Sequence, residues 1–182
     1  MKNVIGIALV FLSLQTLCGQ AIWHVKAIDP QGKLIDVKAF DKNNNVFDVK
    51  AISINGNTQY MDIKAIKNGK QMAVKILLSS DVFAPVKAID EIGMIYDIKA
   101  LTPDKVKWDV KGVSQSGNII HIKAISPAGE FYGIKAISPE GKLHDVKGVK
   151  FNENEIETKL NGVEIWAHVK ACLLYTSDAA DE

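Results

Sequence analysis

The chain has 182 residues, of which 47% are hydrophobic and 24% charged, and its formal net charge is +1. These values fit a single globular domain and exclude a strongly acidic or basic disordered protein. All 22 basic residues are lysine, and they are spread along the chain rather than clustered among aromatic residues. Because arginine, the side chain best suited to grip phosphate, is absent, we do not expect nucleic acid as a partner.

Residues 1–19 have the pattern of a secretory signal peptide. A charged start is followed by an apolar stretch at 4–14, which is too short to span a bilayer, and then by small and polar residues. We expect cleavage near Gly19 and export to the periplasm, the outer envelope or the exterior; a buried first strand or helix is the alternative. Lipid attachment at Cys18 is not expected, because the bulky Leu17 stands where a lipoprotein signal needs a small residue.

Residues 20–171, which we take as one domain, carry a motif about twelve residues long that is repeated throughout. Examples are Ile-Asp-Val-Lys-Ala-Phe at 35–40 and Phe-Asp-Val-Lys-Ala-Ile at 47–52. We call the residue two places before each repeat lysine the acidic position, because it is most often Asp. The repeat lysines are Lys26, Lys38, Lys50, Lys64, Lys75, Lys87, Lys99, Lys111, Lys123, Lys135 and Lys147, with weaker echoes at Lys159 and Lys170.

Each repeat predicts one β-strand and one tight turn. A short run rich in Val, Ile and aromatic residues, bounded by Pro and Gly, is typical of a strand. Asp-Pro-Gln-Gly-Lys at 29–33 and Ser-Pro-Glu-Gly-Lys at 138–142 suit a type I turn in which Gly takes the left-handed conformation. A parallel solenoid is the competing architecture, but the turn residues are too few to return the chain across the strand. We therefore predict an all-β fold, an antiparallel meander of about twelve strands.

The meander predicts which residues face each other. A hairpin centred on Glu140 places Lys135 opposite Asp145, and the same rule sets each repeat lysine opposite the acidic position ten residues later. Because an exposed ion pair contributes only about 0.2–1 kcal/mol, these charges fix the register more than they stabilise the fold. On the apolar face, large residues face small ones, and the expected pairs are Tyr132 with Gly148 and Trp108 with Ala100.

The apolar face of such a meander must be covered, so we expect the strands to fold into two packed sheets or to close into a barrel. The middle of the chain favours two sheets. Between residues 67 and 86 the repeat degrades, and Ala73 and Pro85 occupy acidic positions. Because proline donates no hydrogen bond to a neighbouring strand, we expect a break in the sheet there.

The end of the chain departs from the repeat. Asn161-Gly162 predicts a tight turn that sets Lys159 opposite Glu164. Residues 172–182 resemble the translation of a sequencing adapter, and we take them as a scar, with a genuine tail as the alternative. Both cysteines then fall outside the domain, so no disulfide or thiol chemistry is expected.

The histidines are the main candidates for catalytic or metal-binding residues. His24, His121 and His168 all occupy acidic positions, but they lie far apart along the chain, and each is explained as an exposed partner for a lysine. We therefore predict no catalytic residue, no metal site and no cofactor. His144 falls where other repeats have an aromatic residue. It is expected to pack in the core, together with Trp23, Trp108 and Tyr132.

The repeat resembles secreted bacterial proteins of uncharacterised function that are built from VKAI-type repeats, over residues 22 to about 171. The resemblance implies no activity. We expect a non-enzymatic secreted or envelope-associated module, without a transmembrane span in the mature chain, whose partner is an envelope glycan or protein. The alternative is a module that binds a polysaccharide or polyanion through its lysine and aspartate face. Its candidate residues are Lys99, Asp109, Lys111, His121 and Lys123.

Overall fold

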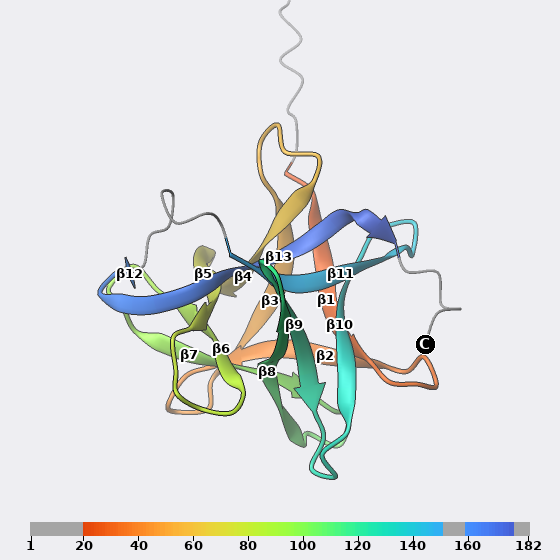
Figure 1. Ribbon diagram of the computed structural model, residues 1–182, viewed down its shortest axis with the longest axis horizontal. Coiled ribbons are helices and arrows are strands. Elements are labelled where there is room, and N and C mark those ends of the chain that lie inside the picture. The colour runs from red at the N-terminus through yellow and green to blue at the C-terminus, as the bar shows by residue number, and fades with distance from the viewer. Residues whose placement is uncertain (1–19, 151–158, 177–182) are drawn as a thin grey trace, which may run out of the picture.

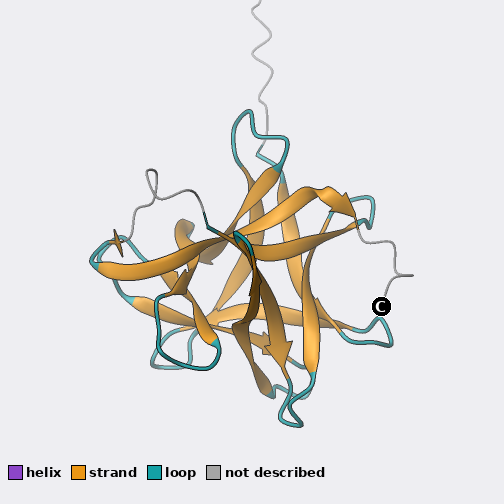
Figure 2. Cartoon of the chain, viewed as in Figure 1, coloured by secondary structure: helices purple, strands orange, loops and turns teal. Residues whose placement is uncertain are grey.

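A computed structural model describes residues 20–150 and 159–176, with side chains through Leu173 (Figures 1 and 2). The predicted signal peptide with Cys18, and residues 177–182, lie outside this described part. The all-β prediction is confirmed, because thirteen strands form one sheet. The strands are β1 (Ile22–Ile28), β2 (Leu34–Phe40), β3 (Val46–Ser53), β4 (Tyr60–Lys67), β5 (Lys70–Leu77), β6 (Ala84–Ile89), β7 (Ile95–Leu101), β8 (Lys107–Ser116), β9 (Ile119–Ile125), β10 (Phe131–Ile137), β11 (Leu143–Val149), β12 (Lys159–Leu160) and β13 (Val163–Thr176).

Consecutive strands from β1 to β11 pair antiparallel, so the predicted meander is confirmed and the solenoid is not adopted. The turns have the expected geometry. Gly32 and Gly141 have φ values of 77° and 82°, and each donates its N–H at 2.9 Å to the carbonyl three residues earlier. Glycine adopts this left-handed conformation without the clash that a Cβ would cause.

Strands that pair over only a short stretch meet in groups of three, and we call each such group a junction. In the first, β1 pairs with β2, β2 with β3 and β3 with β1, so that the strands close around a common centre. The same closure joins β4, β5 and β13; β6, β7 and β8; and β9, β10 and β11. We call these four sets junctions A, B, C and D, in that order.

Longer antiparallel pairs connect the junctions. They are β1–β10, β2–β7, β3–β4, β5–β6, β8–β9 and β11–β13. Each junction is thereby joined to each of the other three, which is the connectivity of the corners and edges of a tetrahedron. The sheet closes on itself in this way, and the hairpin turns project outward around it (Figure 1).

The closed sheet is apolar inside and charged outside. In β2, Ile35 and Val37 are buried, whereas Asp36 and Lys38 are half-buried on the outer face. This alternation follows from the two-residue period of a strand. We call the twelve strands that carry a repeat lysine, β1–β11 and β13, the frame. Its interior is filled mainly by the Val or Ile before each repeat lysine and by the small residue after it, because these positions point inward.

One predicted pair of a large and a small residue is confirmed, and the other is wrong. Trp108 faces Ala100 across β7 and β8. Tyr132, however, faces Ala124 of β9 rather than Gly148 of β11. The hairpin of β10 and β11 pairs over only three residues on each strand, and β9 then enters between the strands to complete junction D.

The sheet break expected between residues 67 and 86 is also wrong. β5 and β6 pair within the same sheet, with Lys75 opposite Lys87. Pro85 is the second residue of β6, where this strand pairs with β8 at Lys111. A residue without an N–H group is tolerated near the start of a strand, so the proline does not interrupt the sheet.

The predicted C-terminal hairpin is confirmed. Asn161 and Gly162 have φ values of 49° and 84°, and β12 pairs with β13 on either side of them. Lys159 Nζ lies 3.4 Å from Glu164 Oε1. The turn therefore has the two left-handed residues that a tight two-residue connection requires.

Strand β13 supplies the twelfth strand of the frame. Its lysine is Lys170, which faces Lys147 of β11, whereas Lys159 lies in the added hairpin. The strand continues through Thr176, and the buried Cys172 pairs with Tyr60 of β4. The boundary expected after residue 171 thus falls inside a strand.

Candidate functional site

The repeat lysines form regular rows on the outer face of the frame. In each long strand pair, the lysine of one strand faces the lysine of the other, as Lys26 faces Lys135. On its other side each lysine faces an acidic position, as Lys26 faces Asp36 and Lys135 faces Asp145. A row therefore has two lysines in its centre and an acidic position at each end. The other central pairs are Lys38 with Lys99, Lys50 with Lys64, Lys75 with Lys87, Lys111 with Lys123, and Lys147 with Lys170.

Ion pairs join the lysines to the aspartates at the ends of the rows. The rule that pairs residues ten apart is confirmed for Lys26–Asp36, Lys38–Asp48, Lys87–Asp97, Lys99–Asp109 and Lys135–Asp145. The hydrogen bond from Lys26 lowers the pKa of Asp36 against the opposing effect of burial, and that from Lys99 does the same for Asp109. These carboxylates are therefore ionised at neutral pH.

Around each junction, three lysines alternate with three acidic positions in a closed ring. In junction D, Asp145 forms ion pairs with two lysines: its Oδ1 lies 2.5 Å from Lys135 Nζ, and its Oδ2 lies 3.1 Å from Lys147 Nζ. Burial raises the pKa of Asp145, but the two lysines outweigh this effect and the pKa is lowered overall. The four rings together contain twelve lysines and six aspartates, so the lattice of the outer face carries an excess of positive charge.

The predicted binding residues lie in and between junctions C and D. Lys99 and Asp109 form an ion pair within junction C. Lys111 and Lys123 face each other in the β8–β9 pair, which connects the two junctions. His121 lies in junction D, two residues before Lys123, and contacts a different lysine. The structure thus brings Lys111 and Lys123 directly together and assigns the other three residues to the flanking rings.

The row of Lys111 and Lys123 differs from the others at its ends. Pro85 faces Lys111, and Gly133 faces Lys123, so that neither end carries a polar side chain. Within the described part of the chain, no carboxylate lies within ion-pair distance of either ammonium group. The sequence shows that Pro85 and Gly133 stand at acidic positions, but it does not show that the two residues lie in one row.

The three histidines at acidic positions lie in three different junctions, so they do not form one site. His24 Nδ1 is 3.1 Å from Lys50 Nζ, and His168 Nδ1 contacts Lys75 Nζ. Burial lowers the pKa of His121, and burial with the charge of Lys75 lowers that of His168 to about 4. Among the described residues, no group of three His, Cys, Asp or Glu side chains is placed to hold a metal ion.

The aromatic residues expected in the core pack there or at its margin. His144 is buried against Trp23, with ring centroids 4.9 Å apart. Trp108 and Tyr132 stack at the same centroid distance and pack against the core while remaining partly exposed. Their rings therefore contribute to packing, as predicted from their positions in the repeat.

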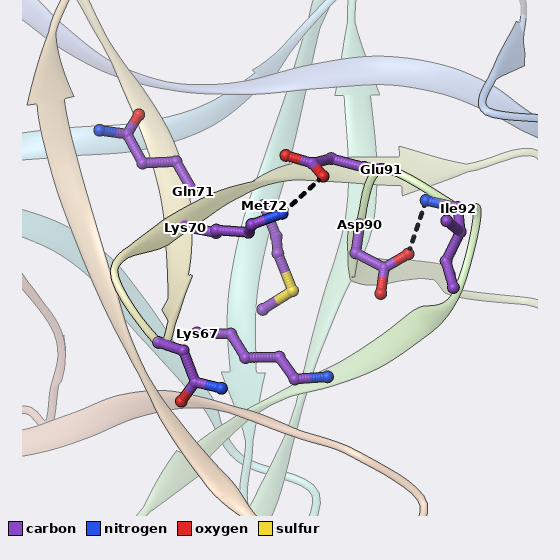
Figure 3. A pocket seen from close by; sticks show the side chains of 8 residues that line it. Lys67, Lys70, Gln71, Met72, Asp90, Glu91 and Ile92 are labelled. Atoms are coloured by element: carbon purple, nitrogen blue, oxygen red, sulfur yellow. Dashed lines mark hydrogen bonds and ion pairs between the residues drawn. The ribbon is translucent and has the colours of Figure 1, made fainter.

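A pocket of about 300 Å³ lies between the β4–β5 turn and the β6–β7 turn (Figure 3). Lys70 Nζ is 3.0 Å from Glu91 Oε2 across it. Lys67 donates at 2.7 Å to the hydroxyl of the buried Tyr96, which in turn donates at 3.0 Å to Asp90 Oδ2. The lining residues are Lys67, Asn68, Lys70, Gln71, Met72, Asp90, Glu91 and Ile92.

The charged groups of this pocket mainly satisfy one another. The hydrogen bond to Tyr96 raises the pKa of Lys67, whose ammonium group also lies 5.7 Å from the centroid of the Phe47 ring. We interpret the polar contacts around the pocket as structural, because they hold the β4–β5 turn against the β6–β7 turn. The pocket was not predicted from the sequence. The Asn-Gly pair at 68–69 indicates the β4–β5 turn, but nothing in the sequence indicates that Asp90 lies close to it.

Comparison with known proteins places the chain in a family. One family model, described as a family of unknown function, matches residues 19–172. No curated protein and no solved structure matches the chain. In the described residues there is no helix with the length and apolar character needed to cross a membrane.

Proposed function

Because the chain belongs to this family of unknown function, DUF7486, we propose its role from its geometry: a non-enzymatic exported module in which the repeats build a rigid frame and the turns contact an envelope glycan or protein. The export part of the proposal rests on the signal-peptide pattern of residues 1–19.

One observation carries the proposal: the repeats use their charged side chains on one another. Most repeat lysines face an aspartate or a histidine of a neighbouring strand. Catalysis needs acid and base groups that converge on one cavity, whereas His24, His121 and His168 occupy separate rings. The lattice is therefore better suited to holding a frame than to chemistry.

Apolar side chains on the turns supply a contact surface. In the β5–β6 connection, Val82 is 91% exposed and Leu78 is 61% exposed. Phe83 of the same connection meets the half-exposed Phe131 edge to face, with centroids 5.7 Å apart. Contiguous exposed apolar residues on a rigid scaffold are typical of interaction sites.

Co-sedimentation with isolated cell-envelope fragments tests the contact role. We expect the purified mature chain to sediment with the fragments, and the double variant Val82→Ser with Phe131→Ser to remain in the supernatant. Val46→Ser, which changes a half-exposed residue at another turn, is the matched control and should sediment normally. A mature chain that does not sediment, or a double variant that sediments like the control, contradicts the proposal.

Substrate screening tests the non-enzymatic part of the proposal. The purified chain is expected to leave panels of glycan, ester and peptide substrates unchanged. The triple variant His24→Gln, His121→Gln and His168→Gln separates true activity from contamination. Hydrolysis that disappears in this variant, while the circular dichroism spectrum is unchanged, would show that the protein is an enzyme.

The excess of lysine in the rings favours a second candidate function, the binding of a polysaccharide or polyanion. A surface with more ammonium than carboxylate groups attracts anionic polymers, and the attraction weakens with added salt. Replacing Lys99, Lys111 and Lys123 together by Gln should abolish retention on a sulfated-glycan resin while the fold is kept. Unchanged retention rejects this candidate.

A further inference from the structure

In the row Pro85–Lys111–Lys123–Gly133, as far as the described residues go, neither lysine faces a carboxylate or forms an ion pair with one. The row of Lys50 and Lys64 also ends without aspartate, in His24 and Ala73, but there Asp62 Oδ2 lies 3.1 Å from Lys64 Nζ. In the row of Lys147 and Lys170, both lysines contact a carboxylate. Among the described residues, Lys111 and Lys123 form the one central pair in which neither lysine has such a contact.

Two like charges are thus held side by side. Lys111 and Lys123 are directly opposed in an antiparallel pair, on the same outer face, and both side chains are half-buried. Like charges directly opposite in a sheet repel, and partial burial reduces the solvent screening that would weaken the repulsion. An anion bound between the two ammonium groups would remove this repulsion.

At Gly133 the end of the row carries no side chain. A Cβ added to Gly133 would meet only Lys135 Cε, at 3.6 Å, which is an ordinary van der Waals contact. Glycine therefore leaves open the place that Asp145 or Asp97 fills beside the lysine of an equivalent row. At the opposite end, Pro85 presents an apolar ring to Lys111.

The surrounding charges favour an external anion. Asp109, two residues before Lys111, is already engaged by Lys99. His121, two residues before Lys123, has its pKa lowered by burial and by neighbouring ammonium groups, so it is neutral at pH 7. The carboxylate on the strand of Lys111 is therefore paired with another lysine, and the imidazole on the strand of Lys123 carries no charge.

We propose that Lys111 and Lys123 bind a doubly charged tetrahedral oxyanion, namely phosphate as the free ion or as a phosphate monoester. The row lacks two carboxylates relative to the row of Lys26 and Lys135, and a phosphate monoester carries about 1.5 to 2 negative charges at neutral pH. Its several oxygen atoms can accept hydrogen bonds from both ammonium groups at once. This site deepens the polyanion-binding candidate and does not depend on the frame proposal.

Titration of the full mature chain with inorganic phosphate, followed by calorimetry and by ³¹P NMR, tests the site at low ionic strength. We expect the double variant Lys111→Gln with Lys123→Gln to lose binding. Gly133→Asp is the sharper variant, because it keeps both lysines and builds in the missing carboxylate. It should weaken phosphate binding about tenfold or more while the protein stays folded.

Two control variants distinguish a local site from general charge. Gly133→Ala fills the same place without charge and should still bind phosphate. Asn55→Asp adds the same negative charge as Gly133→Asp, but on the exposed turn of the β3–β4 pair, which shares no junction with the β8–β9 pair. It should also leave binding unchanged. Equal weakening by Asn55→Asp and Gly133→Asp would overturn the proposal.

Glucose 6-phosphate, tested in parallel, separates the two sources of the ligand. Tighter binding of the monoester than of inorganic phosphate indicates a phosphorylated glycan, and the reverse order indicates the free ion. Absence of phosphate binding to the unmodified chain refutes the site. If retention on the sulfated-glycan resin is then still lost in the triple lysine variant, the broader polyanion candidate survives without it.

Discussion

Gly148 of β11 lies directly against the side chain of Ile76 of β5, although the two residues belong to different junctions. A Cβ on Gly148 would overlap Ile76 Cδ1 and would stand 3.0 Å from the Cβ of Ile120. Both isoleucines are fully buried, so neither can move aside into solvent. The glycine that replaces alanine in this repeat therefore permits a close approach between junctions B and D.

Gly148→Ala should lower the free energy of unfolding by about 1–3 kcal/mol, because the added methyl group overpacks this contact. Urea denaturation followed by tryptophan fluorescence measures the change. Gly133→Ala is the matched control, since its new Cβ has room, and it should change stability little. Adding Ile76→Val to Gly148→Ala removes the clashing atom and should recover part of the loss; equal effects of the two alanine variants would contradict the packing.

Asp145→Asn should cost more stability than Asp97→Asn. The Asp145 side chain is 23% exposed and neutralises two lysines of junction D, whereas Asp97 is 49% exposed and pairs with one lysine. We expect a loss of about 1–3 kcal/mol for Asp145→Asn and about 0.2–1 kcal/mol for Asp97→Asn. Urea midpoints in low and high salt measure both, and the reverse ranking would show that the rings do not act as described.

Stability should fall as the pH drops from about 6.5 towards 4, in part because of His168. Burial and the charge of Lys75 hold the pKa of His168 at about 4 in the folded chain, below the usual histidine value of 6.5. The unfolded chain therefore binds a proton first as the pH falls, and this proton favours unfolding. His168→Gln removes the difference, so its unfolding free energy should change less across this interval. Parallel pH profiles for the two proteins would contradict this role.

Lys105→Gly should raise the free energy of unfolding by about 0.5–1 kcal/mol. Lys105 has a φ of 62°, in the turn position where Gly32 and Gly141 have similar values, and a side chain there strains the backbone. Thermal and urea unfolding provide the measurement. Lys105→Ala removes the charge but keeps a Cβ, so it should give no gain, and equal stabilisation by both substitutions would point to the charge instead.

The strands, the turns and the pairing of neighbouring strands were predictable because each depends on residues close together in the sequence. The two-residue alternation of Ile35 to Lys38 determines which side chains are buried, and glycines such as Gly32 and Gly141 near the end of the polar stretch favour the turn. The ion pair between Lys135 and Asp145 follows from the same hairpin geometry.

The closure of the sheet and the composition of the rows were decided only by the tertiary structure. Each strand from β1 to β11 pairs with three others, and a one-dimensional repeat cannot specify which distant strand is the third, as the false pairing of Tyr132 with Gly148 illustrates. The candidate residues Lys111 and Lys123 were recognisable as lysines of the repeat. Gly133 faces Lys123 between consecutive strands, but Pro85 faces Lys111 only because β6 and β8, which are not consecutive, pair in the closed frame. This pairing is what places Pro85 and Gly133 at the two ends of one row.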